Sequence, residues 1–480
     1  MRKRPFTLVA ALLGLALTAT ACDDEDEGMG PDPMPEATVS LRVVHASPDA
    51  PAVDVYAEGL EEPLFSDVAY GDVTDYLMVP EGTYNIQLRG AGALPSSNPV
   101  YETGDLAVSE GDMITAIATG FLGSMDADDE FRVLPLFEDF TDAGNSARVR
   151  IVHASPDAPT VAIDVGNDGT PEIAALDRFA ETGQPGVELP AGAALQIGIW
   201  AGNPLARVTA FTTPALPAGG ELFVIAIGSL ESLPREETGF SLLAVGSDGA
   251  IGRIGQNPVV YALHAGPDAP AVDIFAGSLE LVDNLSFAEL SGSIQVPPGS
   301  YTLDFFGTTA GSTRPGGAAA ASLDTPTLEA GQRYLAVATG FLAPEMGEEA
   351  FRLAAFRDDL ELVSSTARVS AIHASPDAPA VDIGTVNGGS IDLVVFENVA
   401  YPEGKPQTGA DVPAAALTLG IAPTGSVNPV ATFDIVTASG LRAFAVAVGA
   451  LAPDNGEEAF RLVLVNTTAA PWTATPVNPN

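Results

Sequence analysis

The chain has 480 residues, of which 63 are acidic and 20 are basic, giving a net charge of −43 at pH 7. This charge excludes nucleic-acid binding and disfavours direct adsorption on anionic lipid, because both require a basic surface. The chain contains one cysteine, so no disulfide can form within it, and each domain must be stabilised by its own apolar core.

The N-terminus has the pattern of a secretory signal peptide over residues 1–21. Basic residues at positions 2–4 precede an apolar run from Phe6 to Ala19, which is shorter than the roughly 20 residues of a membrane-spanning helix. The segment before Cys22 resembles a bacterial lipobox, although Ala19 stands where the lipobox usually has leucine. The resemblance implies that Cys22 is lipidated and becomes the mature N-terminus. The alternative is a plain cleavable signal followed by an incidental cysteine.

Residues 22–38 are acidic and rich in proline and glycine, a composition that does not form a packed core. We therefore predict a flexible tether between the lipid and the first domain. Two acyl chains anchor a protein stably, so we expect a lipid-anchored protein of the bacterial cell envelope, facing the periplasm or the outer surface. Its contact with the membrane would be through the N-terminal lipid only, and any envelope or extracellular partner is left unidentified.

A short motif recurs four times and divides the rest of the chain. Each copy begins with one of the four histidines, as His-Ala-Ser/Gly-Pro-Asp-Ala-Pro-Ala/Thr-Val, at intervals of 108, 111 and 109 residues. A near-fixed period indicates one structural unit copied along the chain. The histidine and aspartate of the four copies are His45 and Asp49, His153 and Asp157, His264 and Asp268, and His373 and Asp377. We predict domains at 39–143, 144–252, 253–363 and 364–470, and a flexible tail at 471–480.

Each unit has the pattern of about seven short strands separated by turn residues, with little helical periodicity. In the strand that ends in the motif, Leu41, Val43 and His45 share one face, which we expect to face the core, and Arg42 lies on the other. The last two strands of the units are predicted at 115–120 and 131–136, 222–228 and 240–245, 334–340 and 351–356, and 443–449 and 460–465. This pattern favours an all-β fold of four tandem, loosely immunoglobulin-like β-sandwiches.

The four units are of two kinds. Units one and three share the sequence Ala-Thr-Gly-Phe-Leu, ending at Leu122 and Leu342, whereas units two and four lack its phenylalanine. A two-domain block has therefore been duplicated, and we expect adjacent odd and even units to dock as two pairs.

Three features together resemble a bacterial family known as domain of unknown function 4397. They are the His-Ala-Ser-Pro-Asp-Ala-Pro-Ala-Val-Asp segment, the Pro-x-Gly-x-Tyr turn from Pro80 to Tyr84, and the Ala-Thr-Gly strand. The resemblance covers about residues 39–466 and implies secreted or lipid-anchored envelope proteins with β-rich domains and no assigned activity. Two departures are Gly266 in place of the motif serine, and the absence of the Pro-x-Gly-x-Tyr turn from unit four.

His45, Ser47 and Asp49 have the composition of a catalytic triad. A triad needs the serine within hydrogen-bonding reach of the histidine and the acid behind it, whereas here all three residues crowd one turn. Strand parity directs the histidine toward the core, and Gly266 removes the nucleophile from one copy. We therefore expect no enzyme activity, and we expect each histidine to be a buried structural residue satisfied by its Ser-Pro-Asp turn.

We predict neither a cofactor nor a metal site. One histidine per domain is fewer than transition-metal sites use. Residues 126–130 and 164–169 hint at calcium loops, but neither segment has the full ligand spacing and neither recurs in all four units.

The predicted function is a non-catalytic, lipid-anchored envelope protein that acts as a structural or adhesive array of β-domains. The alternative is an envelope module that binds a glycan, peptide or protein partner with the assistance of calcium. Binding surfaces concentrate exposed aromatic residues, and this chain has only two tryptophans. Trp200 is expected to pack in a core and Trp472 to lie in the tail, which favours the structural role.

Overall fold

The computed structural model describes residues 37–309, 311–454 and 456–480. These residues form 34 strands and no helix, which confirms the all-β prediction. Nothing in the described part of the chain is a helix of the length and hydrophobicity needed to cross a membrane. The predicted signal peptide, Cys22 and all of the predicted tether before residue 37 lie outside the described residues.

Unit one is a sandwich of two four-stranded sheets, and the other units repeat its plan. Its first sheet, in the order β4-β1-β7-β8, contains β1 (Thr38–His45), β4 (Leu77–Pro80), β7 (Met113–Thr119) and β8 (Arg132–Phe137). Its second sheet, in the order β3-β2-β5-β6, contains β2 (Val53–Ala57), β3 (Phe65–Val68), β5 (Gly82–Gly90) and β6 (Tyr101–Val108). The motif strand β1 pairs in parallel with β7, and the other neighbouring strands are antiparallel.

In unit two the first sheet has the order β12-β9-β15-β16-β17 and the second β11-β10-β13-β14. The strands are β9 (Ala147–His153), β10 (Val161–Val165), β11 (Ile173–Leu176), β12 (Val187–Leu189), β13 (Gln196–Ala201), β14 (Ala206–Thr212), β15 (Glu221–Ile227), β16 (Ser241–Gly246) and β17 (Gly249–Ile254). In unit three the orders are β21-β18-β24-β25 and β20-β19-β22-β23. The strands are β18 (Val259–Ala265), β19 (Val272–Ala276), β20 (Leu279–Leu285), β21 (Ile294–Gln295), β22 (Thr302–Gly307), β23 (Ala321–Asp324), β24 (Arg333–Thr339) and β25 (Arg352–Arg357).

In unit four the orders are β29-β26-β32-β33-β34 and β28-β27-β30-β31. The strands are β26 (Ala367–Ala374), β27 (Val381–Asn387), β28 (Ser390–Val399), β29 (Gly404–Val412), β30 (Ala416–Pro423), β31 (Ala431–Val436), β32 (Arg442–Val448), β33 (Arg461–Asn466) and β34 (Thr473–Val477). Four tandem β-sandwiches are therefore confirmed. The even units differ from the odd ones by one added strand at the edge of the first sheet, β17 or β34.

Both faces of the motif strand are buried, for different reasons. Val43 packs into the core between the two sheets of unit one. Val44 and Ala46 point the other way and join an apolar cluster with Val152 and Ile225 of unit two. Alternate side chains of a strand point to opposite faces, so one strand contributes to the core of its own domain and to the contact with the next domain.

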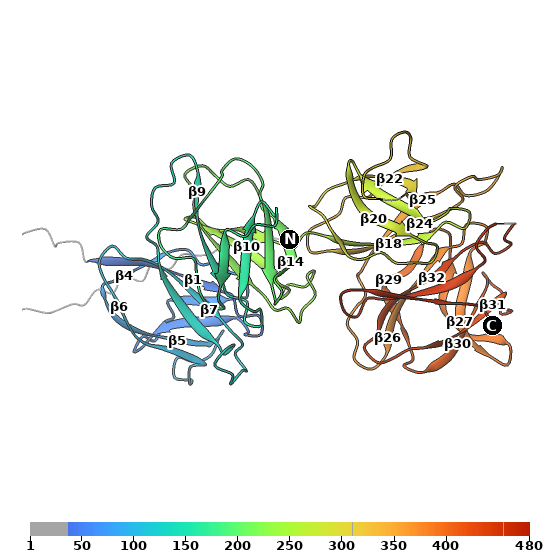
Figure 1. Ribbon diagram of the computed structural model, residues 1–480. Helices are drawn as coiled ribbons and strands as arrows, with labels where there is room; N and C mark the ends of the chain where they lie inside the picture. Colours follow the sequence, from blue (N-terminus) through green and yellow to red (C-terminus); the bar gives the residue numbers. More distant parts are fainter. Residues whose placement is uncertain (1–36, 310, 455) are drawn as a thin grey trace, which may run out of the picture.

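The first sheets of neighbouring odd and even units pack face to face. One apolar cluster joins units one and two, and a second joins units three and four through residues such as Leu263 and Val446. Figure 1 shows the result as two lobes, one coloured blue to green and the other yellow to red. The predicted two docked pairs are confirmed, and we call them the N-terminal lobe (units one and two) and the C-terminal lobe (units three and four).

The contacts between the two lobes include hydrogen bonds and an ion pair between Arg235 and Asp358. Arg235 donates to the carbonyl of Leu360 at 2.5 Å, and Gln295 donates to Thr209 Oγ1 at 3.1 Å. Within the described residues, none of the apolar clusters contains side chains from both unit two and unit three. Apolar burial therefore stabilises each lobe internally and contributes little between the lobes.

The expected flexible tail at 471–480 is wrong for residues 472–477. Residues Thr473–Val477 form β34, which pairs along β33, and Trp472 is buried. Pro476 is tolerated because β34 is an edge strand, where a missing N–H breaks no ladder. At the end of unit two, β17 likewise continues through the expected boundary at 252.

Candidate functional site

The four motif histidines lie in the same buried position, at or next to the end of the first strand of each unit. Each ring is at most 2% exposed. In every copy Nε2 lies 3.0–3.1 Å from a proline carbonyl six residues further on, namely Pro51, Pro159, Pro270 and Pro379. A carbonyl only accepts hydrogen bonds, so Nε2 carries the proton. Burial lowers the pKa of all four histidines, which keeps the rings neutral at pH 7.

The motif serine does not contact the histidine ring through its hydroxyl. Ser47 Oγ donates to the carbonyl of Gly120 at 2.6 Å, and Ser155 and Ser375 make the same bond to Gly228 and Gly449. In units three and four the histidine Nδ1 instead accepts a backbone N–H two residues on, at 3.3 Å. A triad needs the histidine as the base for the serine, and this geometry leaves the serine without one.

The motif aspartate fastens the loop that follows the parallel strand. Asp268 accepts the N–H groups of Leu342 and Ala343 at 2.7 and 2.8 Å. Asp49, Asp157 and Asp377 hold the matching loops at residues 122–123, 229–230 and 451–452. We expected backbone carbonyls and the carboxylate of the turn to satisfy the histidine. A proline carbonyl does so at Nε2, but the carboxylate holds the loop instead, and Nδ1 of His45 and His153 is buried without a hydrogen-bond partner. The motif therefore ties two loops together at one corner of each sandwich.

Steric contacts explain why glycine occurs at two positions of the motif corner. Gly120 has φ of +89°, and a Cβ there would lie 2.3 Å from the carbonyl oxygen of Glu130; the last residue of Ala-Thr-Gly must therefore be glycine. Gly266, which replaces the motif serine in unit three, lies where a Cβ would approach the Phe351 ring to 2.9 Å. The replacement of the motif serine by glycine in unit three thus accompanies a close contact with Phe351, the residue directly before β25.

The threonine of Ala-Thr-Gly explains why odd and even units differ. Thr119 Oγ1 donates to the carbonyl of Ala154 in unit two at 2.6 Å, and Thr339 Oγ1 donates to Ala374 in unit four at 2.8 Å. In the even units the same position is Ile227 or Val448, both fully buried in the inter-domain clusters. The threonine is visible in the sequence of the odd units, but its role can be recognised only once the partner domain that accepts its hydrogen bond is known.

Arginine–aromatic contacts complete each interface from both sides. In the N-terminal lobe Arg132 lies over Phe179 at 4.1 Å and Arg253 over Tyr70 at 5.8 Å. In the C-terminal lobe Arg461 lies over Phe287 at 4.9 Å and Arg352 over Tyr401 at 5.7 Å. Each domain thus offers an arginine and an aromatic ring to its partner, as in a two-fold interface. Sequence analysis missed these pairs.

Arg253 fills a place that strand β16 of unit two leaves empty. Arg132, Arg352 and Arg461 begin the last or penultimate strand of their first sheets, whereas unit two has Ser241 there. Arg253 reaches this place from β17, donating to Ser241 Oγ at 2.7 Å and to the carbonyl of Gly239 at 2.8 Å.

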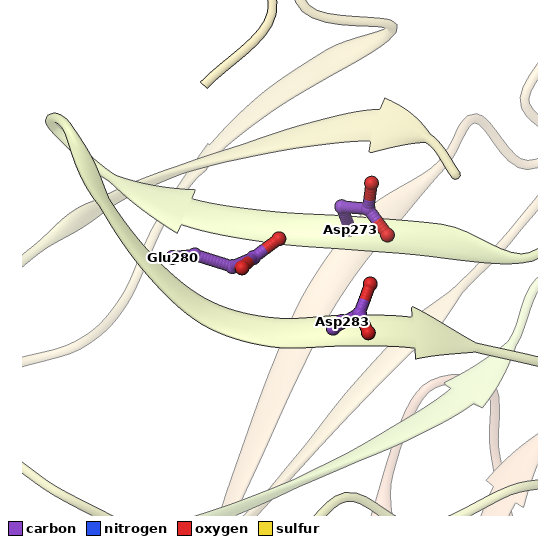
Figure 2. Close-up of side chains that lie close together, drawn as sticks. All are labelled: Asp273, Glu280 and Asp283. Carbon is purple, nitrogen blue, oxygen red and sulfur yellow. The ribbon is translucent and has the colours of Figure 1, made fainter. Parts of the chain in front are cut away.

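One group of carboxylates among the described residues has the spacing of a metal site. Asp273 of β19 and Glu280 and Asp283 of β20 have ligand atoms within 4.8 Å of one another, and Figure 2 shows the three side chains converging between the two strands. Both oxygens of Asp273 are already used, however, because they accept the N–H groups of Asn284 and Thr309 at 2.9 Å. We therefore assign no ion to this group.

The two segments that hinted at calcium are turns closed by their own carboxylates. Asp126 Oδ1 accepts the N–H of Asp128 at 3.1 Å. Asp164 accepts the N–H groups of Asp168 and Gly169 and the indole N–H of Trp200. The bond of Asp126 is that of an ordinary Asx turn, and Asp164 closes its loop through N–H groups four and five positions further on.

The profile of a family described as "Domain of unknown function (DUF4397)" matches residues 39–164 and 258–384, just over half of the chain. The chain belongs to this family. Each DUF4397 match runs through an odd unit and into β10 or β27 of the following even unit, so each contains two copies of the histidine motif. No curated protein matches the sequence. Among solved structures, the Bacillus anthracis TIE protein is similar at a TM-score of 0.14 and 9% identity, over 85% of this chain and 67% of that one.

Proposed function

We propose that the chain is a non-catalytic protein of the bacterial cell envelope, anchored by a lipid on Cys22, whose two lobes serve as a structural or adhesive array. The observation that supports it best is the fate of the motif side chains. In all four units the histidine and aspartate, which are the residues most suggestive of chemistry, are committed to hydrogen bonds with backbone groups of their own domain. A group committed in this way to holding the fold is not free to serve a reaction.

The anchoring part of the proposal rests on the N-terminal sequence. Cys22 is the only cysteine of the chain and follows a basic and then an apolar segment. Lipidation gives this residue a role, and the acidic segment after it separates the first domain from the membrane. The large negative charge disfavours any second contact with anionic lipid, so the lobes extend away from the surface.

Lipidation is tested by expressing the full chain in a bacterium that is fed an alkyne-bearing fatty acid. We expect label on the wild-type protein, recovery with the membrane fraction, and loss of both in Cys22→Ala. A second variant, Cys22→Ser, controls for side-chain size. Recovery of unlabelled wild-type protein from the soluble fraction would contradict anchoring and leave the array proposal to be tested separately.

The absence of catalysis is tested with a serine-reactive fluorophosphonate probe on the purified protein. We expect no labelling of Ser47, Ser155 or Ser375, since each hydroxyl donates to a glycine carbonyl, with the motif aspartate as a second acceptor, and none is hydrogen-bonded to the histidine. Labelling of Ser47 in the wild type that disappears in a folded His45→Gln variant would overturn the proposal.

A further inference from the structure

Unit four contains a cavity between its two sheets that is much larger than the matching spaces in the other units. Its volume is about 330 Å³, against 120 Å³ in unit one, 50 Å³ in unit two and 40 Å³ in unit three. The inner wall is apolar and is made by residues that include Val369, Phe396, Val412, Leu419 and Ile435. The space between the two sheets is therefore larger in unit four than in the other three copies of the sandwich.

The cavity has an identifiable cause in one strand position. In each unit the strand parallel to the motif strand has an alanine opposite the histidine. The residue four positions before this alanine therefore occupies the same place in all four units. These residues are Ile114, Leu222, Tyr334 and Ala443, and all four are buried. Ala443 lines the cavity, so unit four has a methyl group where the other units have a large side chain.

A second position adds to the difference. Tyr301 of unit three and Ala415 of unit four occupy matching positions, because the backbone N–H of each donates to a threonine hydroxyl, Thr325 Oγ1 and Thr437 Oγ1 respectively. Tyr301 lines the space between the sheets of unit three. The loss of the Pro-x-Gly-x-Tyr turn from the fourth repeat thus removes an aromatic ring from the same end of the sandwich.

The cavity opens between the edge strands β31 and β34. Its rim includes Val436, which is 76% exposed, and the exposed residues Thr473 and Thr475. Asp434 is the one charged residue of the lining. An acidic group at the mouth, on a chain with a net charge of −43, disfavours an anionic ligand.

We propose that this cavity binds one small, uncharged, mainly apolar molecule, with its polar end among the threonines of the rim. Ligand sites start at roughly 300 Å³ and combine apolar walls with a few polar groups. Apolar cavities stay dry and take up apolar guests, and since a cavity of about 150 Å³ holds a benzene molecule, one of about 330 Å³ accommodates a longer guest. A short-chain alcohol has this size and chemistry. The proposal does not depend on lipid anchoring or on the role of the array.

The test is a calorimetric titration of the purified protein with 1-octanol. We expect one equivalent to bind to the wild type, and octanoate, which has the same chain and a negative charge, to bind at least tenfold more weakly. Ala443→Leu installs the residue that unit two has at this register and should abolish octanol binding without lowering the melting temperature. Ala438→Leu makes the same change at an exposed position of unit four and should bind octanol like the wild type.

A rim variant keeps the test decisive if Ala443→Leu fails to fold. Thr475→Trp changes an exposed residue of the mouth and should weaken octanol binding at least tenfold in a protein with an unchanged melting temperature. Failure of the wild type to bind octanol would overturn the proposal. Binding that survives in both a folded Ala443→Leu and Thr475→Trp would overturn it as well, because the octanol would then occupy another place.

Discussion

The two lobes use one docking geometry with different chemistry at its centre. The residue three positions before the motif histidine points into the interface in every unit. It is Arg42 and Arg150 in the N-terminal lobe, and Tyr261 and Ser370 in the C-terminal lobe, and all four are at most 2% exposed. The comparison indicates that the packing of the two first sheets determines how the domains dock. The side chains at the centre of the interface can differ between lobes, provided that their polar groups find hydrogen-bond partners.

The centre of the N-terminal lobe is ionic and hydrogen-bonded. Arg42 forms a salt bridge with Glu138 at 3.1 Å and donates to Thr115 Oγ1 at 2.7 Å and to the carbonyl of Gly246 in unit two at 2.5 Å. Arg150 of unit two pairs with Glu181 at 2.7 Å and donates to the carbonyl of Phe137 in unit one. Each arginine thus crosses to the partner domain, which offsets the cost of burying its charge.

The centre of the C-terminal lobe is aromatic. Trp472 stacks on Tyr261 with ring centroids 4.4 Å apart and planes at 11°. Asp358 follows β25 as Glu138 follows β8, but the motif-strand residue that matches Arg42 is here Tyr261, which cannot form an ion pair with it. Arginines from units two and four, Arg235 and Arg442, instead lie 3.8 Å from its carboxylate.

The largest expected effect is that of Trp472→Ala on the C-terminal lobe. The change removes a buried aromatic ring from the inter-domain cluster, and such truncations cost about 4 kcal/mol. Scanning calorimetry should show the C-terminal lobe melting earlier, while the fluorescence of Trp200 reports an unchanged N-terminal lobe. A shift of the Trp200 transition of similar size would contradict the separation of the lobes.

Arg42→Met is the matching change in the N-terminal lobe and should cost about 3 kcal/mol. It leaves the Glu138 carboxylate, which is 8% exposed, without its ion-pair partner, and breaking a buried pair from one side is strongly destabilising. Urea denaturation followed by Trp200 measures the loss. The double variant Arg42→Met with Glu138→Leu should recover most of the stability; if it does not, the centre of this lobe depends on charge rather than on packing.

His45→Ala and His264→Ala should both destabilise their lobes, and the loss should be somewhat larger for His264→Ala, because His264 Nδ1 also accepts the N–H of Gly266. Each removes the same bond from Nε2 to a proline carbonyl, and leaving a buried acceptor unsatisfied costs about 2 kcal/mol. Denaturation of each variant, read at Trp200 for His45→Ala and at Trp472 for His264→Ala, makes the comparison. No loss in either lobe would show that the motif histidine does not stabilise the corner.

The stability of the two lobes should also depend differently on pH, and this is the smallest of the expected effects. Burial lowers the pKa of the histidines in the folded state below the ordinary 6.5, so the unfolded chain binds protons more readily and stability falls as the pH drops below about 6.5. Burial raises the pKa of Asp358 above its ordinary 3.8, which has the opposite sign and is confined to the C-terminal lobe. Calorimetry from pH 7 downward should show both lobes losing stability below about pH 6.5, with a smaller loss in the C-terminal lobe once Asp358 takes up a proton. An N-terminal lobe that gains stability over this range would argue against buried, neutral histidines.

Much of the fold could be predicted because the same pattern of strands and turns occurs in all four repeats. The predicted last strand at 131–136 is β8 (Arg132–Phe137), and the pairing of odd with even units followed from the sequence Ala-Thr-Gly-Phe-Leu, whose phenylalanine the even units lack. The outer face of the motif strand was harder to interpret, because Arg42 and Arg150 look like solvent-facing residues until the partner sheet is known.

Other features depend on contacts that are distant in sequence. Trp472 looked like part of a tail because its partner Tyr261 lies 211 residues away. The motif aspartates hold loops more than 70 residues further on, a pairing that no local pattern indicates. Ala443 lies in an apolar strand like those of the other units, and only the register of the parallel pair shows that a large side chain is missing there.

The most direct test of the two-lobe account is native-state hydrogen exchange, read by mass spectrometry across a urea series. The account predicts that the slowest amides of β1 and β9 share one opening free energy, and that those of β18 and β26 share another. Each pair of domains would then unfold as a single cooperative unit. Separate opening of unit one from unit two, or of unit three from unit four, would contradict the claim that the docked sheets make each lobe one structure.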